Sequence, residues 1–156
     1  MWQRRLAVVL PIVVAAGLIW WWRQGPSDRQ QIGALIGKVV HGIETKSMSE
    51  VMGCVAPDYR DPEGMSHGDV ARTVLEWSRG GAQADIVLDN YEINITPPTA
   101  TGVFSVHVLL EEQGETAGLD LNLTVQFEKQ RRRWRRVWLV KSVSGYEPER
   151  VWGDML

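Results

Sequence analysis

The sequence predicts an α+β domain in which about three helices pack on a curved four-stranded antiparallel sheet, behind an N-terminal transmembrane helix. The first observation is an uncharged apolar run over residues 6–22. The second is helical spacing of apolar residues between residues 32 and 77, and the third is alternation of apolar and polar residues from Ala84 on. A length of 156 residues with 44% hydrophobic content suits one globular domain and a short additional segment.

The apolar run from Leu6 to Trp22 has the features of a membrane anchor. Its seventeen residues would rise about 25 Å as a helix, which is just enough for the hydrocarbon core of a bilayer. Arg4 and Arg5 precede the run, and three tryptophans close it like an interfacial aromatic belt. A cleaved signal peptide is the alternative, but it requires small residues where these tryptophans and Arg23 stand. We interpret residues 1–23 as a single-pass anchor in an inner or plasma membrane, with a cytoplasmic N-terminus and an extracytoplasmic domain.

Three helices are expected after a polar hinge over residues 24–30, where Ser27 or Asp28 can cap the first of them. That helix carries an apolar stripe at helical spacing, made by Ile32, Leu35, Ile36, Val39, Val40 and Ile43. A short helix is expected over residues 49–55. The stretch "SHGD" (Ser66 to Asp69) resembles a capping box and begins a third helix, with Val70, Val74 and Trp77 on one face.

Four strands follow, expected over residues 84–95, 100–112, 119–128 and 134–144. Pro97-Pro98 and the turn "EQGETAG" separate the first three. Consecutive strands joined by short turns pair antiparallel. We place the domain at residues 31–146 and a C-terminal tail at residues 147–156.

This order of elements resembles the nuclear transport factor 2-like, or SnoaL-like, superfamily. The resemblance rests on the first helix with the following "HGIETKSMSEVMGCVAPDYRDPEG", on the helix from Ser66, and on the final hairpin "FEKQRRRWRRVWLVKSV". It implies a cone formed by the helices and the concave face of the sheet. The superfamily includes ketosteroid isomerases, polyketide cyclases, dehydratases and proteins that only bind partners, so the resemblance fixes no activity. Some members stand behind one membrane helix, such as the inner-membrane assembly factors of type IV secretion.

The two central strands direct no titratable group into this cone. The inward set of the third strand must be its five apolar residues, because a shift of one residue would expose all of them: Leu119, Leu121, Leu123, Val125 and Phe127. In the second strand the apolar set is Phe104, Val106, Val108 and Leu110, which leaves His107 on the convex face. Proton transfer needs a carboxylate or imidazole within reach of the substrate.

Four residues remain as pocket candidates. Tyr59 and Asp61 lie on the loop at the mouth of the cone, Trp77 on the third helix, and Tyr91 on a face shared with Val87, Ile93 and Ile95. Each also has a structural interpretation, as a core aromatic residue or, for Asp61, as a turn residue before Pro62. The isomerase site resembles an aspartate base with donors to an enolate, but Asp61 matches it only loosely in position, and we assign no catalytic residue.

The sequence contains no motif for a metal or a cofactor. HExxH, GxSxG, a Walker loop and paired metal-ligand spacing are absent, and Cys54 is the only cysteine. We therefore expect no metal and no cofactor.

A basic interaction patch is expected at the turn between the last two strands, made by Lys129, Arg131, Arg132, Arg133, Arg135 and Arg136. The simplest interpretation is a solvated hairpin tip whose charges prevent edge pairing. Residues 27–156 carry 14 Lys and Arg against 19 Asp and Glu, a net charge of −5 that would be −11 without this patch. Such a field attracts anionic partners, either lipid headgroups or an acidic surface of a protein. Nucleic acid is disfavoured, because the rest of the domain would repel phosphates.

The favoured function is that of a membrane-anchored, non-catalytic binding or scaffold protein that binds a protein partner, itself or lipid. One alternative is a carrier of a small apolar ligand in the cone, which needs a cavity of about 300 Å³ or more. The other is an isomerase- or cyclase-like enzyme. A cone filled by Phe104, Leu121 and Trp77 would exclude that enzyme.

Overall fold

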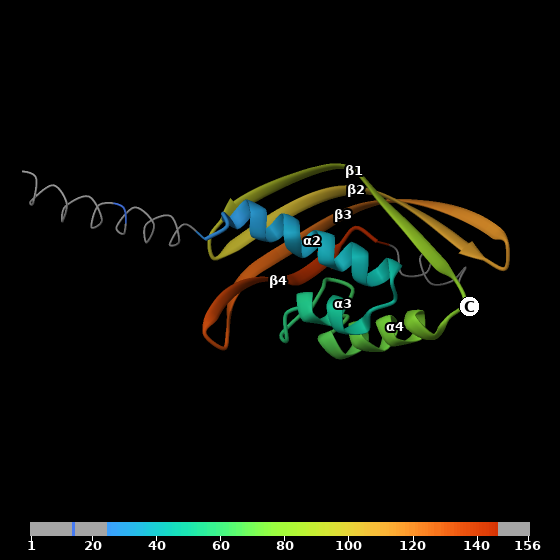
Figure 1. Cartoon of the computed structure of the whole chain (residues 1–156), viewed down its shortest axis with the longest axis horizontal. Helices are drawn as coiled ribbons and strands as arrows, with labels where there is room; N and C mark the ends of the chain where they lie inside the picture. Colours follow the sequence, from blue (N-terminus) through green and yellow to red (C-terminus); the bar gives the residue numbers. More distant parts are fainter. Residues whose placement is uncertain (1–13, 15–24, 147–156) are drawn as a thin grey trace, which may run out of the picture.

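The computed structural model describes residue 14 and residues 25–146, which form three helices on one face of a four-stranded antiparallel sheet (Figure 1). The helices are α2 (Asp28–Glu44), α3 (Met48–Cys54) and α4 (His67–Arg79). The strands are β1 (Gln83–Thr96), β2 (Thr99–Glu112), β3 (Glu115–Arg132) and β4 (Arg135–Ser144), in the order β1-β2-β3-β4. The predicted element order and antiparallel pairing are confirmed.

The described residues contain no helix that is long and apolar enough to cross a membrane. The predicted anchor over residues 1–23 lies outside the described residues, apart from Val14, and the predicted tail over residues 147–156 lies wholly outside them.

Two capping boxes begin the longer helices: the one predicted at Ser66, and one at Ser27, which was one of the two caps expected for the first helix. At α2 the Ser27 hydroxyl accepts from the Gln30 amide at 3.3 Å, and the Gln30 side chain accepts from the Ser27 amide at 3.0 Å. At α4 the Ser66 amide donates to Asp69 at 2.9 Å. Because α2 begins at Asp28, residues 28–30, which we expected in the hinge, form its first turn.

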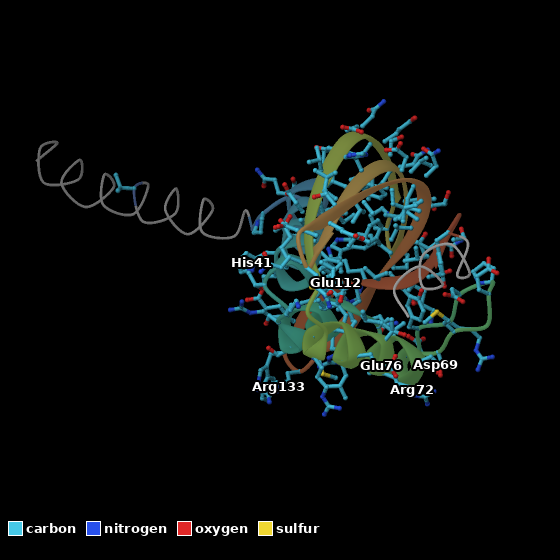
Figure 2. All side chains as sticks on the ribbon, turned by 90° about the vertical axis from the view of Figure 1, so that its right-hand side faces the viewer. His41, Asp69, Arg72, Glu76, Glu112 and Arg133 are labelled. Atoms are coloured by element: carbon cyan, nitrogen blue, oxygen red, sulfur yellow. The ribbon has the colours of Figure 1, made fainter. Side chains whose placement is uncertain are left out.

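The helices turn their apolar faces to the sheet and their charged faces to solvent. Figure 2 shows Asp69, Arg72 and Glu76 on the outer side of α4, away from the strands. The core lies between the helices and the sheet, where Ile32 of α2 and Phe127 of β3 are the largest fully buried side chains. The rings of Phe104 and Phe127 meet edge to face at 6.4 Å.

The start of α2 is fixed to the end of the sheet by Asp28. Its carboxylate accepts from Lys129 Nζ at 2.6 Å and from Trp138 Nε1 at 2.9 Å. These hydrogen bonds hold the pKa of Asp28 below its usual range, with the bond from Lys129 as the largest cause. The contact joins residues that are 101 and 110 positions apart in the chain.

β1 contains a bulge between Leu88 and Asn90 that changes which residues face inward. Before the bulge Ile86 and Leu88 face the helices, and after it Ile93 does. Our prediction that Val87 shares a face with Tyr91 is therefore wrong: Val87 is on the outer face and 45% exposed. The extra residue interrupts the regular alternation of inward and outward side chains that we assumed for this strand.

We expect Phe127→Ala to lower the free energy of unfolding by about 3–5 kcal/mol, because it removes a side chain that is only 2% exposed. Urea unfolding of the domain measures the change. Val103→Thr on the outer face of the neighbouring β2 is the control and should change it by less than about 0.5 kcal/mol. A loss below 1 kcal/mol at Phe127 would contradict the described core.

Candidate functional site

The helices and the concave face of the sheet enclose a cavity of about 390 Å³. Strands β2 and β3 line it with alternate residues of the predicted inward sets: Phe104, Val106, Val108 and Leu110 from β2, and Leu121, Leu123, Val125 and Phe127 from β3. Leu119, the fifth residue predicted for β3, is not part of the lining. Val74 and Trp77 of α4 line the opposite wall. Phe104, Leu121 and Trp77 are thus walls of an open cone and do not fill it.

The cavity lining is almost entirely apolar. Among the described residues, no Asp, Glu, His, Cys, Lys or Arg side chain lines it. Its polar side chains are Tyr59, Thr73, Trp77 and Tyr146. Trp77 donates its indole N–H to the Ile43 carbonyl at 3.0 Å, so this ring presents only its apolar surface to the cavity. The described lining therefore offers no group that transfers protons at neutral pH.

The polar end of the cavity is a cluster of Tyr59, Tyr146 and Asp61. Asp61 is 5% exposed. One carboxylate oxygen of Asp61 accepts hydrogen bonds from the hydroxyls of Tyr146 and Tyr59, the latter at 3.1 Å. The second carboxylate oxygen accepts from the Met65 amide at 2.9 Å. Both tyrosines line the cavity whereas Asp61 does not, so the carboxylate lies behind the phenol groups.

Tyr146 is a site residue that the sequence analysis missed, because we placed it at the boundary of the C-terminal tail. Its position depends on Gly145, which has a φ of +90°. A side chain at Gly145 would place its Cβ 2.3 Å from the Asn122 carbonyl oxygen. The glycine allows the chain to turn at the end of β4, so that Tyr146 returns to the cavity. A glycine followed by an aromatic residue directly after the last strand was the available signal.

Burial and the Asp61 charge keep both phenols protonated. Burial is the largest cause that raises the pKa of Tyr59 and Tyr146, and the nearby Asp61 carboxylate raises both further. A tyrosine hydroxyl has one hydrogen to donate. When both hydrogens point to Asp61, the phenol oxygens present only acceptor lone pairs to the cavity.

Tyr91, predicted as a pocket residue, lies outside the cavity lining. Its ring stacks on Phe104 with centroids 6.0 Å apart, and its side chain is 56% exposed at the β1 edge. His107 lies on the convex face, as predicted, and bonds Asp120 of β3 at 2.5 Å. That bond is the main cause that raises the pKa of His107.

The predicted basic patch divides into two groups according to the contacts that its residues make. β3 continues to Arg132, and Arg133 and Trp134 form the turn. Lys129 and Arg132 are engaged with the helical layer, through Asp28 and through the Gly53 carbonyl at 2.9 Å. Four arginines are exposed and form no ion pair with any residue among 25–146: Arg131, Arg133, Arg135 and Arg136. Trp134 between them is 93% exposed.

Comparison with known proteins relates this chain to others by fold. No family model matches the sequence, and no curated protein matches it. A candidate dehydratase of the nuclear transport factor 2-like family from Streptomyces avermitilis superposes with a TM-score of 0.62 at 15% identity, over 74% of this chain and 93% of that one.

Two further structures show the same similarity. A nuclear transport factor 2-like superfamily protein from Salmonella enterica serovar Typhimurium has a TM-score of 0.61 at 16% identity, over 76% of this chain and 90% of its own. A protein from Catenulispora acidiphila in complex with S-DNPA has a TM-score of 0.61 at 14% identity, over 80% and 96%. At these identities the similarity shows the fold alone.

The buried tyrosines make the stability of the domain depend on alkaline pH. Their raised pKa values stabilise the fold fully below the ordinary tyrosine pKa of about 10, and this contribution is lost as pH rises further. We expect the unfolding free energy to fall less between about pH 9 and 11 in the Tyr59→Phe/Tyr146→Phe variant than in the wild type. Urea unfolding at each pH measures this. Tyr91→Phe, which makes no contact with Asp61, is the control and should keep the wild-type slope; equal slopes in all three proteins would contradict the cluster.

Proposed function

We propose that this domain binds a small, mainly apolar molecule in the cone and holds it without transforming it. The observation that carries the proposal is the cavity of about 390 Å³ with apolar walls. This volume lies within the range of about 300–1,000 Å³ that is usual for small-molecule sites. It also exceeds the minimum that a carrier of an apolar ligand requires.

The chemistry of the lining favours binding over catalysis. An isomerase- or cyclase-like enzyme would need an acid or base that reaches the substrate. The Asp61 carboxylate bonds two phenol groups that line the cavity, but Tyr59, Tyr146 and the Met65 amide already donate to it. The phenols that stand between Asp61 and the cavity have raised pKa values and serve poorly as bases at neutral pH.

The structural neighbours include support for ligand binding and support for catalysis. The Catenulispora acidiphila protein in complex with S-DNPA is a case of a ligand bound by a protein of this fold. The Streptomyces avermitilis protein, a candidate dehydratase, keeps the enzyme as the second candidate function. The two differ in what is recovered after incubation: a carrier returns its ligand unchanged, and a dehydratase returns it lighter by one water.

The same proposal places the domain outside the cell membrane, behind the anchor expected over residues 1–23. The apolar run supports this location, and the hinge is short enough to keep the cavity near the bilayer. An apolar ligand partitions into membranes, so a carrier at this surface would meet it there.

A substitution that fills the cone should abolish binding. We expect Val106→Phe, whose side chain points into the cavity, to weaken binding of the neutral fluorophore N-phenyl-1-naphthylamine at least about tenfold. The matched control is Val103→Phe, in the same strand but on the outer face, where the valine is 53% exposed. Fluorescence titration measures both. Equal affinities for the two variants would place the fluorophore outside the cone and overturn the proposal.

The polar end of the cavity should select ligands that donate a hydrogen bond. Because the two phenol oxygens offer acceptors, we expect decanol to compete with the fluorophore about fivefold better than its methyl ether, and decanoate to compete least. Tyr146→Phe should reduce the preference for the alcohol. A preference for decanoate would show that the phenols rotate to donate, and would contradict the acceptor assignment.

A further inference from the structure

Charge is separated along the longest strand of the sheet. β3 begins at Glu115, next to Glu111 and Glu112 at the end of β2, and it ends at Arg132. The β2–β3 hairpin is therefore acidic at its tip and the β3–β4 hairpin is basic. Figure 1 shows these two hairpins at opposite ends of the sheet. Such a separation gives the domain an orientation in an electric field.

Only some of the basic residues at the tip make contacts with the rest of the described domain. Lys129 and Arg132 are held by the helical layer, as described above, but Arg131, Arg133, Arg135 and Arg136 extend into solvent. Trp134 is the most exposed of the large hydrophobic side chains between residues 25 and 146. A solvated tip accounts for the arginines. It does not account for an indole that is 93% exposed, because transfer of this apolar ring from water to an interface is favourable.

The tip lies at the end of the domain where the chain enters from its N-terminal segment. Asp28, the first residue of α2, bonds Lys129 and Trp138, which face each other across β3 and β4. From there the hairpin continues for about four residues per strand, or about 13 Å. Figure 1 shows the start of α2 and this hairpin at the same end of the molecule.

We propose that the tip of the β3–β4 hairpin, residues 131–136, is a second membrane contact that binds an anionic phospholipid surface. The four exposed arginines, Arg131, Arg133, Arg135 and Arg136, bind headgroup phosphates, and the Trp134 indole enters the interface between headgroups and acyl chains. The acidic β2–β3 hairpin then points away from the bilayer. This inference rests on the proposed anchor and is independent of what the cone binds.

The chain lengths agree with this arrangement. Five residues separate Trp22, at the end of the apolar run, from Asp28, so α2 begins within about 20 Å of the membrane end of that run. A tip that extends about 13 Å from the same point toward the bilayer would span most of this distance. A lipid surface also fits the mixed chemistry of the patch better than an acidic protein does, because a bilayer presents phosphates directly beside an apolar layer.

The test uses the full chain in nanodiscs that contain phosphatidylcholine and a diazirine-tagged lipid, with the tag near the top of one acyl chain. The tagged lipid is phosphatidylglycerol in one sample and phosphatidylcholine in the other. After illumination, mass spectrometry maps lipid adducts on the peptides. We expect adducts at residues 131–136 to be at least about fivefold more frequent with phosphatidylglycerol, and to decrease at about 0.5 M NaCl.

Two variants distinguish the contribution of the arginine charges from that of the Trp134 indole, and a matched control checks the orientation. Replacing the four exposed arginines by glutamine should remove the preference for phosphatidylglycerol, and Trp134→Ser should reduce adducts with both lipids. The matched control replaces Glu111, Glu112 and Glu115 by glutamine, and should leave the adducts at residues 131–136 unchanged. Circular dichroism verifies that each variant is folded.

Three outcomes would overturn the proposal. Equal adducts with both lipids would exclude headgroup recognition, and adducts on both hairpins would exclude the orientation. A chain that enters nanodiscs without any adduct at residues 131–136, but cross-links there to a protein in native membranes, would make the tip a protein-binding surface. A chain that does not enter nanodiscs would exclude the anchor and, with it, this contact.

Discussion

The structure depends on one constraint: the sheet is curved, and the part of its concave face that lines the cavity is apolar. Period-two alternation places the apolar residues of β2 and β3 on that face, where eight of them line the cavity, and the face must be covered to be removed from water. Three helices cover it without filling it, and the space that remains is the cavity. Apolar walls without packing partners lose dispersion contacts, so an apolar occupant would stabilise the domain by binding the folded state alone.

Asp28 fixes the start of the helical layer to the end of the sheet at which the chain enters the domain. Its carboxylate holds the start of α2 against Lys129 and Trp138, and so fixes where the helical layer lies on the sheet. The lowered pKa gives the sign of the pH effect: the contribution to stability is present above the ordinary aspartate pKa of about 3.9 and is lost as pH falls below it. The position of the basic hairpin relative to the hinge follows from the same contact.

Local patterns in the sequence were sufficient for most of the fold. Ser27 and Ser66 cap helices because their partners stand three residues ahead, and the inward faces of β2 and β3 follow from alternation alone. The β1 bulge was not predictable, since nothing in the chain before Tyr91 signals an extra residue there. The bulge follows shortly after Ile86, whose amide donates to Glu44 of α2 at 3.0 Å.

The site was less predictable, because it depends on contacts between distant residues. Lys129 and Arg132 could not be separated from the other four basic residues by sequence, since only the fold brings Asp28 and Gly53 beside them. The polar cluster likewise joins Asp61 to Tyr146 across 85 positions.

That cluster also decides how the cone differs from a proton-transfer site. A buried carboxylate acts as a base only where one of its lone pairs meets the substrate. Asp61 is surrounded by three donors, and its charge is what makes the burial of two phenol groups favourable. Releasing an oxygen for catalysis would leave a tyrosine hydroxyl without its partner beside an apolar cavity, at a cost of about 1–3 kcal/mol. The arrangement therefore opposes movement of Asp61 toward the cavity, and it is suited to presenting fixed acceptors to a bound molecule.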